Sequence, residues 1–453
     1  MLNRSLKILY IAHRIPYPPN KGDKIRSFNE IKHLSSSHNV DLVCLADNAD
    51  DLKYKSNLQK YCRRVFVQHF KVSQAKLRGL VSLIKGKTIS VGYFYSKKIQ
   101  QVIDQWLSDT DYDAIICFSS PMAEYLFQSP FLSHCFSKFP QSPPSIALAQ
   151  ARQAGATHAL HRSRSGEAGG RNLQLIMDFC DVDSEKWLQY SQRSKFPLNL
   201  IYRIENKRLL EYEKKINRSF DSSVFVSQQE ADLFYRLFPE AENVSVIENG
   251  VDYEYFSPES RILNPEPRTL IFTGAMDYYA NIDGVKWFCE KILPIVKDRY
   301  PKIQFYIVGS NPNAEIQKLG DNNKSINITG FVEDIRPYYN NADICVIPLR
   351  IARGIQNKVL EAMSMGKAVV TTSTAVQSIK ATSGVHLLVE DDSDKFAEAV
   401  SMLLENHSLR NYLGTNARQF VKSNYNWQKN MKKFDKLICD LKFSATNDTN
   451  EHK

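Results

Sequence analysis

Residues 350–372 read RIARGIQNKVLEAMSMGKAVVTT and follow the apolar run ADICVIP at 342–348. The apolar run predicts a buried strand, and the segment then passes through a turn with Gly354 into a helix over 358–363 that stops at Gly366. A second strand, AVVTT at 368–372, follows the helix. Strand, turn and helix in this order are typical of a parallel α/β layer, so this stretch indicates the fold class.

The same alternation occurs in both halves of the chain. Strand-like runs separated by helical stretches are KILYIA (7–12), VDLVCLA (40–46), RVFVQHF (64–70), AIICFS (114–119) and LIMDF (175–179), then TLIFTGAM (269–276), IQFYIVGS (303–310) and INITGF (326–331). At 453 residues the chain is longer than one hydrophobic core usually supports. We therefore expect an α/β protein of two facing, Rossmann-like, doubly wound domains with a ligand-binding cleft between them.

The domain boundaries follow from where the strand series begin and end. We expect a first domain over 1–250, a second over 251–425, and a C-terminal helix with a disordered tail over 426–453. Residues 133–170 break the pattern because they are rich in Ser, Pro, Gln, Ala and Gly, so they are expected to form a mobile insertion.

Composition narrows the class of protein. Hydrophobic residues make up 43% of the chain and charged residues 24%, which is ordinary for a globular protein. No apolar run approaches the roughly 20 residues that a membrane span needs, and the N-terminus lacks the features of a signal peptide. The eight cysteines are scattered without CxxC pairs, which favours reduced thiols in the cytoplasm.

The net charge of +10 is unevenly placed. From Lys60 to Lys98 the chain has ten Lys or Arg residues and no Asp or Glu. Within this region Leu77, Leu80, Val81 and Ile84 recur at helical spacing between basic residues, a pattern that suits a helix lying on an anionic membrane. A solvated basic face over ordinary core leucines fits the same pattern equally well. The region matches no nucleic-acid-binding module, so we expect no nucleic-acid partner.

The turn and helix after residue 350 carry the main candidate chemistry. A helix N-terminus presents unpaired backbone N–H groups and a partial positive charge, so the turn at 354–357 suits a diphosphate. Lys358 adds a full positive charge there, and Glu361, one turn further on, can accept hydrogen bonds from a ribose diol. Taken alone these two residues are weak evidence, because many surface helices carry both.

The flanking residues strengthen this interpretation. The segment 350–372 resembles the donor-site signature of retaining glycosyltransferase family four, which has the GT-B fold. Similarity extends through KILYIAHRIPYPPNKGDKIRS, VIENGVDYEYFSP, TGAMDYYANIDGVKWF and ITGFVEDIRPYYNNADICVIPLR. DFCDVDSEKW and FVSQQEADLF resemble the sugar transferases associated with PEP-CTERM/exosortase systems and exopolysaccharide clusters.

The sequence departs from the family pattern at two places. Arg353 stands where family four commonly has a first Glu, eight positions before Glu361, and TGAMDYYANIDG lacks the usual Arg and Lys for the diphosphate. We therefore expect Arg350, Arg353 and Lys358 to neutralise the phosphates. The resemblance implies a donor-binding set of Gly274, Arg350, Gly354, Gln356, Asn357, Lys358 and Glu361, with Arg353 a catalytic candidate.

In the first domain two loops are candidates for the acceptor side. The resemblance places Lys21, Gly22 and Asp23 in a loop near the diphosphate and the acceptor. Asp178 is the second catalytic candidate, to orient the acceptor hydroxyl, whereas Asp183 is expected to cap the helix that follows. We expect no metal, because GT-B enzymes stabilise the leaving diphosphate with helix dipoles and cations.

The resemblance implies transfer of a sugar from a nucleoside diphosphate donor to a glycan or lipid-linked acceptor in exopolysaccharide biosynthesis, with retention and without a cofactor. The expected location is the inner face of the cell membrane. A catalytically silent GT-B scaffold that binds nucleotide or glycan is the alternative, motivated by Arg353. A nicotinamide-dependent oxidoreductase is disfavoured, because no G-x-G-x-x-G follows the first strand.

Overall fold

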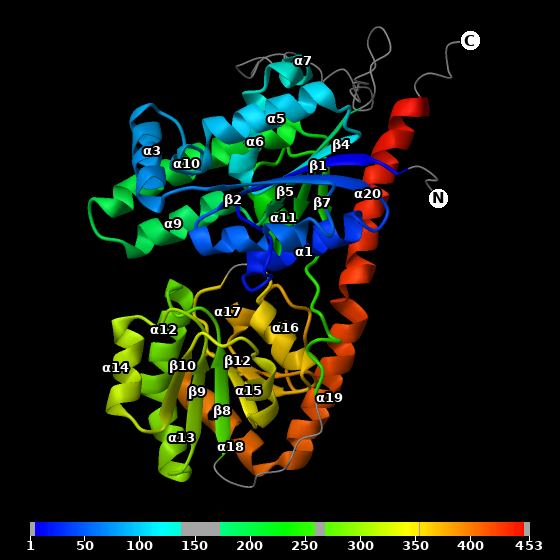
Figure 1. The fold of residues 1–453 in the computed structure, drawn as a ribbon. Coiled ribbons are helices and arrows are strands. Elements are labelled where there is room, and N and C mark those ends of the chain that lie inside the picture. The colour runs from blue at the N-terminus through cyan, green and yellow to red at the C-terminus, as the bar shows by residue number, and fades with distance from the viewer. Residues whose placement is uncertain (1–4, 137–172, 259–267, 353, 448–453) are drawn as a thin grey trace, which may run out of the picture. The chain divides into compact units, whose positions relative to one another are not determined.

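The computed structural model describes residues 5–136, 173–258, 268–352 and 354–447. The chain divides into two compact units, which we call the first and the second unit (Figure 1). The first unit comprises Met1–Phe225, Glu230–Ile247 and Met431–Lys453, and the second comprises Val226–Gln229 and Glu248–Asn430. Most of the insertion expected at 133–170 lies outside the described residues.

The first unit is built on a seven-stranded parallel sheet in the order β3-β2-β1-β4-β5-β6-β7. Its strands are β1 (Lys7–Ala12), β2 (Asn39–Ala46), β3 (Arg64–His69), β4 (Ala114–Phe118), β5 (Gln174–Cys180), β6 (Ser222–Phe225) and β7 (Val244–Val246). The central strands are apolar at nearly every position because helices cover both faces of the sheet. The short and only partly buried β7 is the strand that the sequence did not predict.

The helices of the first unit lie on both faces of its sheet, with α1 on one face and α5 and α6 on the other (Figure 1). They are α1 (Gly22–Leu34), η1 (Ala49–Tyr54), α2 (Lys55–Leu58), α3 (Val72–Ile84), α4 (Ile89–Phe94), α5 (Lys97–Asp109), η2 (Ser120–Met122), α6 (Ala123–Phe127), η3 (Pro130–Leu132), α7 (Ser133–Phe136), α9 (Asp183–Arg193), α10 (Leu198–Ser219) and α11 (Gln228–Leu237). The C-terminal helix α20 (Trp427–Asn447) joins this unit from residue 431 onward.

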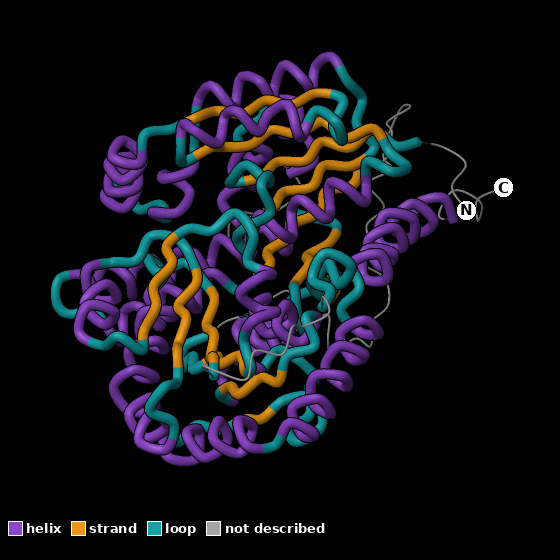
Figure 2. Tube along the Cα trace, turned by 60° about the horizontal axis from the view of Figure 1, so that its bottom comes forward, coloured by secondary structure: helices purple, strands orange, loops and turns teal. Residues whose placement is uncertain are grey.

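The second unit has a six-stranded parallel sheet in the order β10-β9-β8-β11-β12-β13, whose strands are visible in Figure 2. Its strands are β8 (Thr269–Thr273), β9 (Gln304–Val308), β10 (Ile326–Gly330), β11 (Ile344–Ile347), β12 (Ala368–Thr371) and β13 (Leu388–Val389). Its helices are α12 (Tyr279–Trp287), η4 (Phe288–Ile292), α13 (Leu293–Arg299), α14 (Ala314–Asn322), α15 (Arg336–Asn341), α16 (Asn357–Ser364), α17 (Ser373–Val376), α18 (Ser393–Glu405) and α19 (His407–Asn424). The two parallel sheets confirm the predicted fold class.

Each sheet reverses its strand order once, and the reversal positions the site. In the first unit the reversal lies between β1 and β4, and in the second between β8 and β11. Consecutive crossovers run in opposite directions from such a point, so the loops at the carboxyl ends of the two strands diverge and leave room for a ligand. The loops after β1, β4, β8 and β11 are therefore the places to look for chemistry.

Candidate active site

Three residues meet where β8 and β11 end in the second unit. Gly274 follows β8 with a φ of 153°, and a Cβ at this position would lie 2.7 Å from Asn281 Nδ2 and 2.8 Å from Lys358 Nζ. The Lys358 ammonium donates a hydrogen bond of 2.5 Å to Asn281 Oδ1. Asn281 itself donates from Nδ2 to the carbonyl of Ala275 at 2.8 Å. Only glycine leaves space for the lysine to reach the end of β8.

Among the carboxylates of the described residues, none accepts a hydrogen bond from the Lys358 ammonium. Its Nζ lies 4.4 Å from the centre of the Phe272 ring and bonds to the neutral amide of Asn281. Burial lowers the pKa of Lys358 to about 7, against the opposing charge of Glu361. The lysine is thus held at a position where an added negative charge would favour its protonated form.

Glu361 contacts a different neutral group, the Tyr339 hydroxyl. The Tyr339 hydroxyl lies 3.4 Å from Glu361 Oε2 and 2.8 Å from Thr273 Oγ1. Burial raises the pKa of Glu361 to about 7, although the nearby Lys358 and the Tyr339 hydroxyl both lower it. Because the two residues are three positions apart on α16, their side chains project from the same face of the helix.

The turn before α16 is suited to an anion. Gly354 has a φ of 59°, which glycine adopts without strain, and the side chain of Gln356 makes no capping hydrogen bond at the N-terminus of α16. Asn357 Oδ1 is buried, and no described residue donates to it. The preceding loop is fixed by Gln377, which donates to the Ala352 carbonyl at 3.0 Å. Arg353 lies outside the described residues.

Arg350 is engaged elsewhere. Its guanidinium binds Asp283 through Nε at 3.1 Å and Nη2 at 2.6 Å, beside Trp287, and its side chain remains 50% exposed. Asn281 and Asp283 are two residues apart on α12, which corresponds to about 200° around a helix axis. Lys358 and Arg350 therefore contact different sides of α12, so the structure does not bring these two cations together.

In the first unit, Lys21, Gly22 and Asp23 form the start of α1. Lys21 and Gly22 are exposed, and Asp23 pairs with Arg14 at 2.5 Å and with His13 Nε2 at 3.2 Å. Although burial acts to raise it, the hydrogen bond from His13 and the charge of Arg14 hold the pKa of Asp23 well below its usual range. This acid is already neutralised by the loop after β1.

Asp178 lies near the carboxyl end of β5, level with the last residue of β4, and is buried in the core. It is fully buried within β5, where Arg26 binds its Oδ2 at 2.9 Å and 2.6 Å, and the backbone N–H of Cys180 binds its Oδ1 at 2.9 Å. A catalytic role would require contact with the acceptor, so this arrangement gives Asp178 a structural role. The expected capping role of Asp183 is wrong: α9 begins at Asp183 itself, and its side chain binds Lys186 at 2.9 Å.

Sequence reasoning missed the neutral partners. Asn281, Tyr339 and Thr273 hold Lys358 and Glu361 but carry no charge that a motif search would notice. Asn281 lies in the stretch TGAMDYYANIDG, which the resemblance included, but the sequence alone did not single it out. His13 and Arg14 follow the first strand directly, and that position alone was a signal.

Comparison with known proteins defines the class. Residues 267–406 match the family model for glycosyl transferases group 1, and this range holds the candidate site. The chain matches sucrose-phosphate synthase from Thermosynechococcus elongatus with a TM-score of 0.68 at 16% identity, over 97% of this chain and 100% of that one. The two parallel-sheet units thus have the GT-B fold, and the second unit contains the residues that match the group 1 glycosyl transferase model.

The chain is also similar to two further proteins. An uncharacterized 44.6 kDa protein in the cps region of Klebsiella pneumoniae is 23% identical over 433 residues, which cover 93% of this chain and 97% of the relative. The structure of Anabaena HepE in complex with UDP and glucose matches with a TM-score of 0.61 at 14% identity, over 96% of this chain and 100% of that one.

Two features are absent from the described residues. No group of three or more His, Cys, Asp or Glu side chains in the described ranges is arranged to hold a metal ion. Among the same residues, no helix combines the length and the apolar character that crossing a membrane requires.

Proposed function

We propose that the protein transfers a hexose-type sugar from a nucleoside diphosphate donor to a hydroxyl of a glycan or lipid-linked acceptor in exopolysaccharide biosynthesis, with retention at the anomeric carbon. The group 1 match and the relative from a cps region support this reaction and this setting. HepE, whose structure contains UDP and glucose, supports a nucleotide-sugar donor. We extend the proposal to family four and to its exosortase-associated members, which the sequence resembles.

The observation that carries the proposal is the position of Lys358. It stands at the N-terminus of α16, beside the glycine that ends β8, and its hydrogen bond goes to a neutral amide. A lysine held in this way is stabilised by a ligand that brings negative charge. The diphosphate of the donor supplies that charge, and the backbone N–H groups at the start of α16 add their dipoles.

The same residues can stabilise the leaving group. As the bond between the anomeric carbon and the diphosphate breaks, negative charge grows on the diphosphate, where Lys358 and the α16 N-terminus would bind it more strongly. The acceptor oxygen forms the new bond on the same face of the sugar, and its proton passes to the departing diphosphate. Glu361 accepts hydrogen bonds from the ribose diol, which orients the nucleotide.

We propose that neither a metal nor a cofactor takes part. Lys358 and the helix dipole provide the stabilisation that a divalent cation gives in other transferases. Nucleotide release should therefore persist in EDTA, and a loss of more than about tenfold that magnesium restores would contradict this part of the proposal.

The test is release of nucleoside diphosphate from a panel of UDP-, GDP- and ADP-hexoses, with and without total lipid-linked glycan as acceptor. We expect release from one nucleotide class and a strong dependence on acceptor. The second candidate, a silent scaffold, is favoured by Arg353 in place of the first Glu. A scaffold would bind one nucleotide, measured by calorimetry, and release none from any donor.

A further inference from the structure

Helix α3 buries its small residues and exposes its large apolar residues. Its buried residues are the small Ala75, Gly79 and Ser82, whereas Leu77 and Ile84 are 63% and 79% exposed. An ordinary surface helix turns its large apolar residues toward the core. In α3 the large residues face outward, so the solvated basic helix over core leucines is not the arrangement found.

The exposed apolar residues form one stripe. Leu77, Leu80, Val81 and Ile84 are all exposed and follow the i, i+3, i+4, i+7 spacing of a single helix face. Lys76 and Lys85 are exposed as well, and helical geometry places them about 80–100° to either side of Leu77. An apolar stripe with a lysine on each side fits a helix that lies in a membrane interface.

Close packing holds the inner face of α3 in place. A Cβ on Gly79 would lie 2.9 Å from Ile89 Cγ2, and one on Gly92 would lie 2.5 Å from Ser82 Cβ. Arg208 of α10 donates to the Leu83 carbonyl at 2.7 Å and to the Lys87 carbonyl at 3.1 Å. The exposure of the stripe is therefore a feature of a packed helix and not of a loose segment.

A second apolar projection lies at the turn between α9 and α10. Phe196 is 79% exposed, and Leu198 and Leu200 are about half exposed. In Figure 1 this turn and α3 project from the same side of the first unit. Both α3 and α9 follow strands, β3 and β5, by three residues, so both begin at the carboxyl edge of the sheet. We call α3 and this turn the apolar face.

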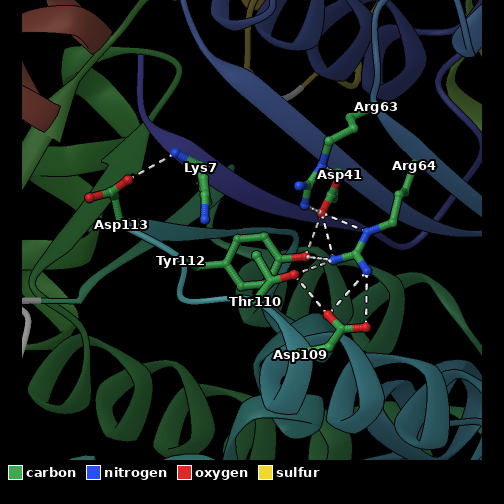
Figure 3. A network of polar contacts seen from close by, with 8 residues as sticks. All are labelled: Lys7, Asp41, Arg63, Arg64, Asp109, Thr110, Tyr112 and Asp113. Atoms are coloured by element: carbon green, nitrogen blue, oxygen red, sulfur yellow. Dashed lines mark hydrogen bonds and ion pairs between the residues drawn. The ribbon is translucent and has the colours of Figure 1, made fainter. Parts of the chain in front are cut away.

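Not all of the basic region contributes to that face. Figure 3 shows Arg63 and Arg64 bound to the buried Asp41, with Tyr112 donating to the same carboxylate, and Arg64 also bound to Asp109. These two arginines stabilise the opposite, amino end of the sheet. Lys71, Lys76, Lys85 and Lys87 remain exposed at or near α3.

We propose that the apolar face binds an anionic lipid bilayer, with α3 lying in the interface. Charge complementarity selects this partner, because cations flank the apolar stripe without an acidic residue from 60 to 98. Two separate convex projections also suit a deformable bilayer. The proposal deepens the proposed function, since it brings the carboxyl edge of the first sheet to a lipid-linked acceptor.

The experiment is sedimentation of the full chain with vesicles of phosphatidylcholine containing about one third phosphatidylglycerol, the range in which anionic lipid attracts basic segments. Wild-type protein should bind these and bind pure phosphatidylcholine at least about tenfold more weakly. Lys76→Glu with Lys85→Glu should weaken binding by about twentyfold or more, from roughly fivefold for each lost cation. Leu80→Gln with Ile84→Gln should abolish it. Phe196→Trp should show a blue shift of emission on adding anionic vesicles.

Matched controls keep the test sharp. Lys318→Glu with Lys395→Glu makes the same change in net charge on exposed helix positions of the second unit, and Ile295→Gln removes an exposed apolar residue there. Both should bind like wild type. Equal binding to neutral and anionic vesicles, or wild-type binding by the α3 variants, would overturn the proposal. Nucleotide release in detergent with a soluble acceptor should survive in the α3 variants, so failure of docking and failure of transfer are distinguishable.

Discussion

The charged residues at the carboxyl edges of the two sheets have different kinds of partner. In the first unit, Arg14 pairs with Asp23, Arg26 with Asp178, and Lys186 with Asp181 and Asp183. In the second unit, Lys358 bonds to the neutral Asn281 and Glu361 lies against the neutral Tyr339. The charged residues named in the first unit are thus paired with opposite charges, whereas Lys358 and Glu361 have neutral hydrogen-bond partners although Arg350 nearby pairs with Asp283.

This difference appears in the pKa values. In the first unit, opposite charges hold the pKa of Asp23 low and, against burial, the pKa of Lys186 well above its usual range, so both groups stay charged near neutrality. In the second unit, burial brings the pKa of both Lys358 and Glu361 to about 7. Groups that titrate near neutrality are common at functional sites. We therefore expect a structural role for the charged groups of the first unit and propose ligand binding for Lys358 and Glu361.

The largest expected effect comes from breaking a neutralised pair. Asp178→Ala leaves the buried Arg26 with only Glu30, at 3.0 Å, as a carboxylate partner, which should lower the free energy of unfolding by up to about 3–5 kcal/mol. Asp181→Ala, which removes a partly exposed partner of Lys186, should cost below about 1 kcal/mol. Chemical denaturation monitored by circular dichroism measures both. A stable Asp178→Ala protein without turnover would restore Asp178 as a catalytic residue and break the comparison.

The next effect tests the second edge. Lys358→Ala should reduce donor turnover by roughly 10²–10³-fold, the usual loss when one group that stabilises a leaving oxyanion is removed. The melting temperature should change little, because the hydrogen bond that Lys358 loses goes to the neutral Asn281 and Glu361 keeps its contact with the Tyr339 hydroxyl. Lys318→Ala, an exposed lysine on α14, is the matched control and should keep the wild-type rate. Equal rates in the two variants would remove Lys358 from the site.

The fold could be predicted from sequence because strands such as β4 and β11 are short apolar runs bounded by turn residues. The turn and helix of the donor segment followed from Gly354, Lys358 and Gly366 for the same local reason. Partners distant in sequence could not be predicted. Arg26 is 152 residues from Asp178, so nothing local shows that this carboxylate is already paired.

The directions in which side chains project could not be predicted from the sequence either. Arg350 precedes Lys358 by eight residues, and the sequence does not fix where a loop with Gly354 sends each side chain. The structure resolves this through two residues of α12, Asn281 and Asp283, which bind Lys358 and Arg350 separately. The role of Arg353 stays a prediction.

A smaller effect is expected in the uptake of protons when a nucleotide binds, which tests whether Lys358 titrates near neutrality. With a pKa near 7, Lys358 is mostly neutral at pH 8, and a bound diphosphate would raise that pKa, so UDP binding should take up roughly 0.5–1 proton. Glu361 is mostly ionised at pH 8 and contributes little. Affinity for UDP should fall as the pH rises above 7, by up to about tenfold per unit. Calorimetry at pH 8 in two buffers of different ionisation enthalpy measures the uptake.

The control for this measurement is Lys358→Arg, which keeps a positive charge at every pH. Its proton uptake at pH 8 should be close to zero, and its affinity should lose most of the dependence on pH. Equal uptake by Lys358→Arg and wild type would mean that another group titrates, and Lys358 would then be charged before the ligand arrives.

The smallest effect is expected at Arg350. Because Asp283 holds its guanidinium on the other side of α12 from Asn281, Arg350→Ala should lower turnover by less than about threefold and stability by about 0.2–1 kcal/mol, as for other exposed pairs. Asp283→Ala removes the other partner, and if Arg350 is remote from the diphosphate, UDP affinity should not change. A loss in Arg350→Ala as large as that in Lys358→Ala would mean that Arg350 leaves Asp283 for the donor. The donor site of the second unit would then use a cation that is paired with a carboxylate in the free protein. The two carboxyl edges would in that case differ only in how strongly their charged residues are paired.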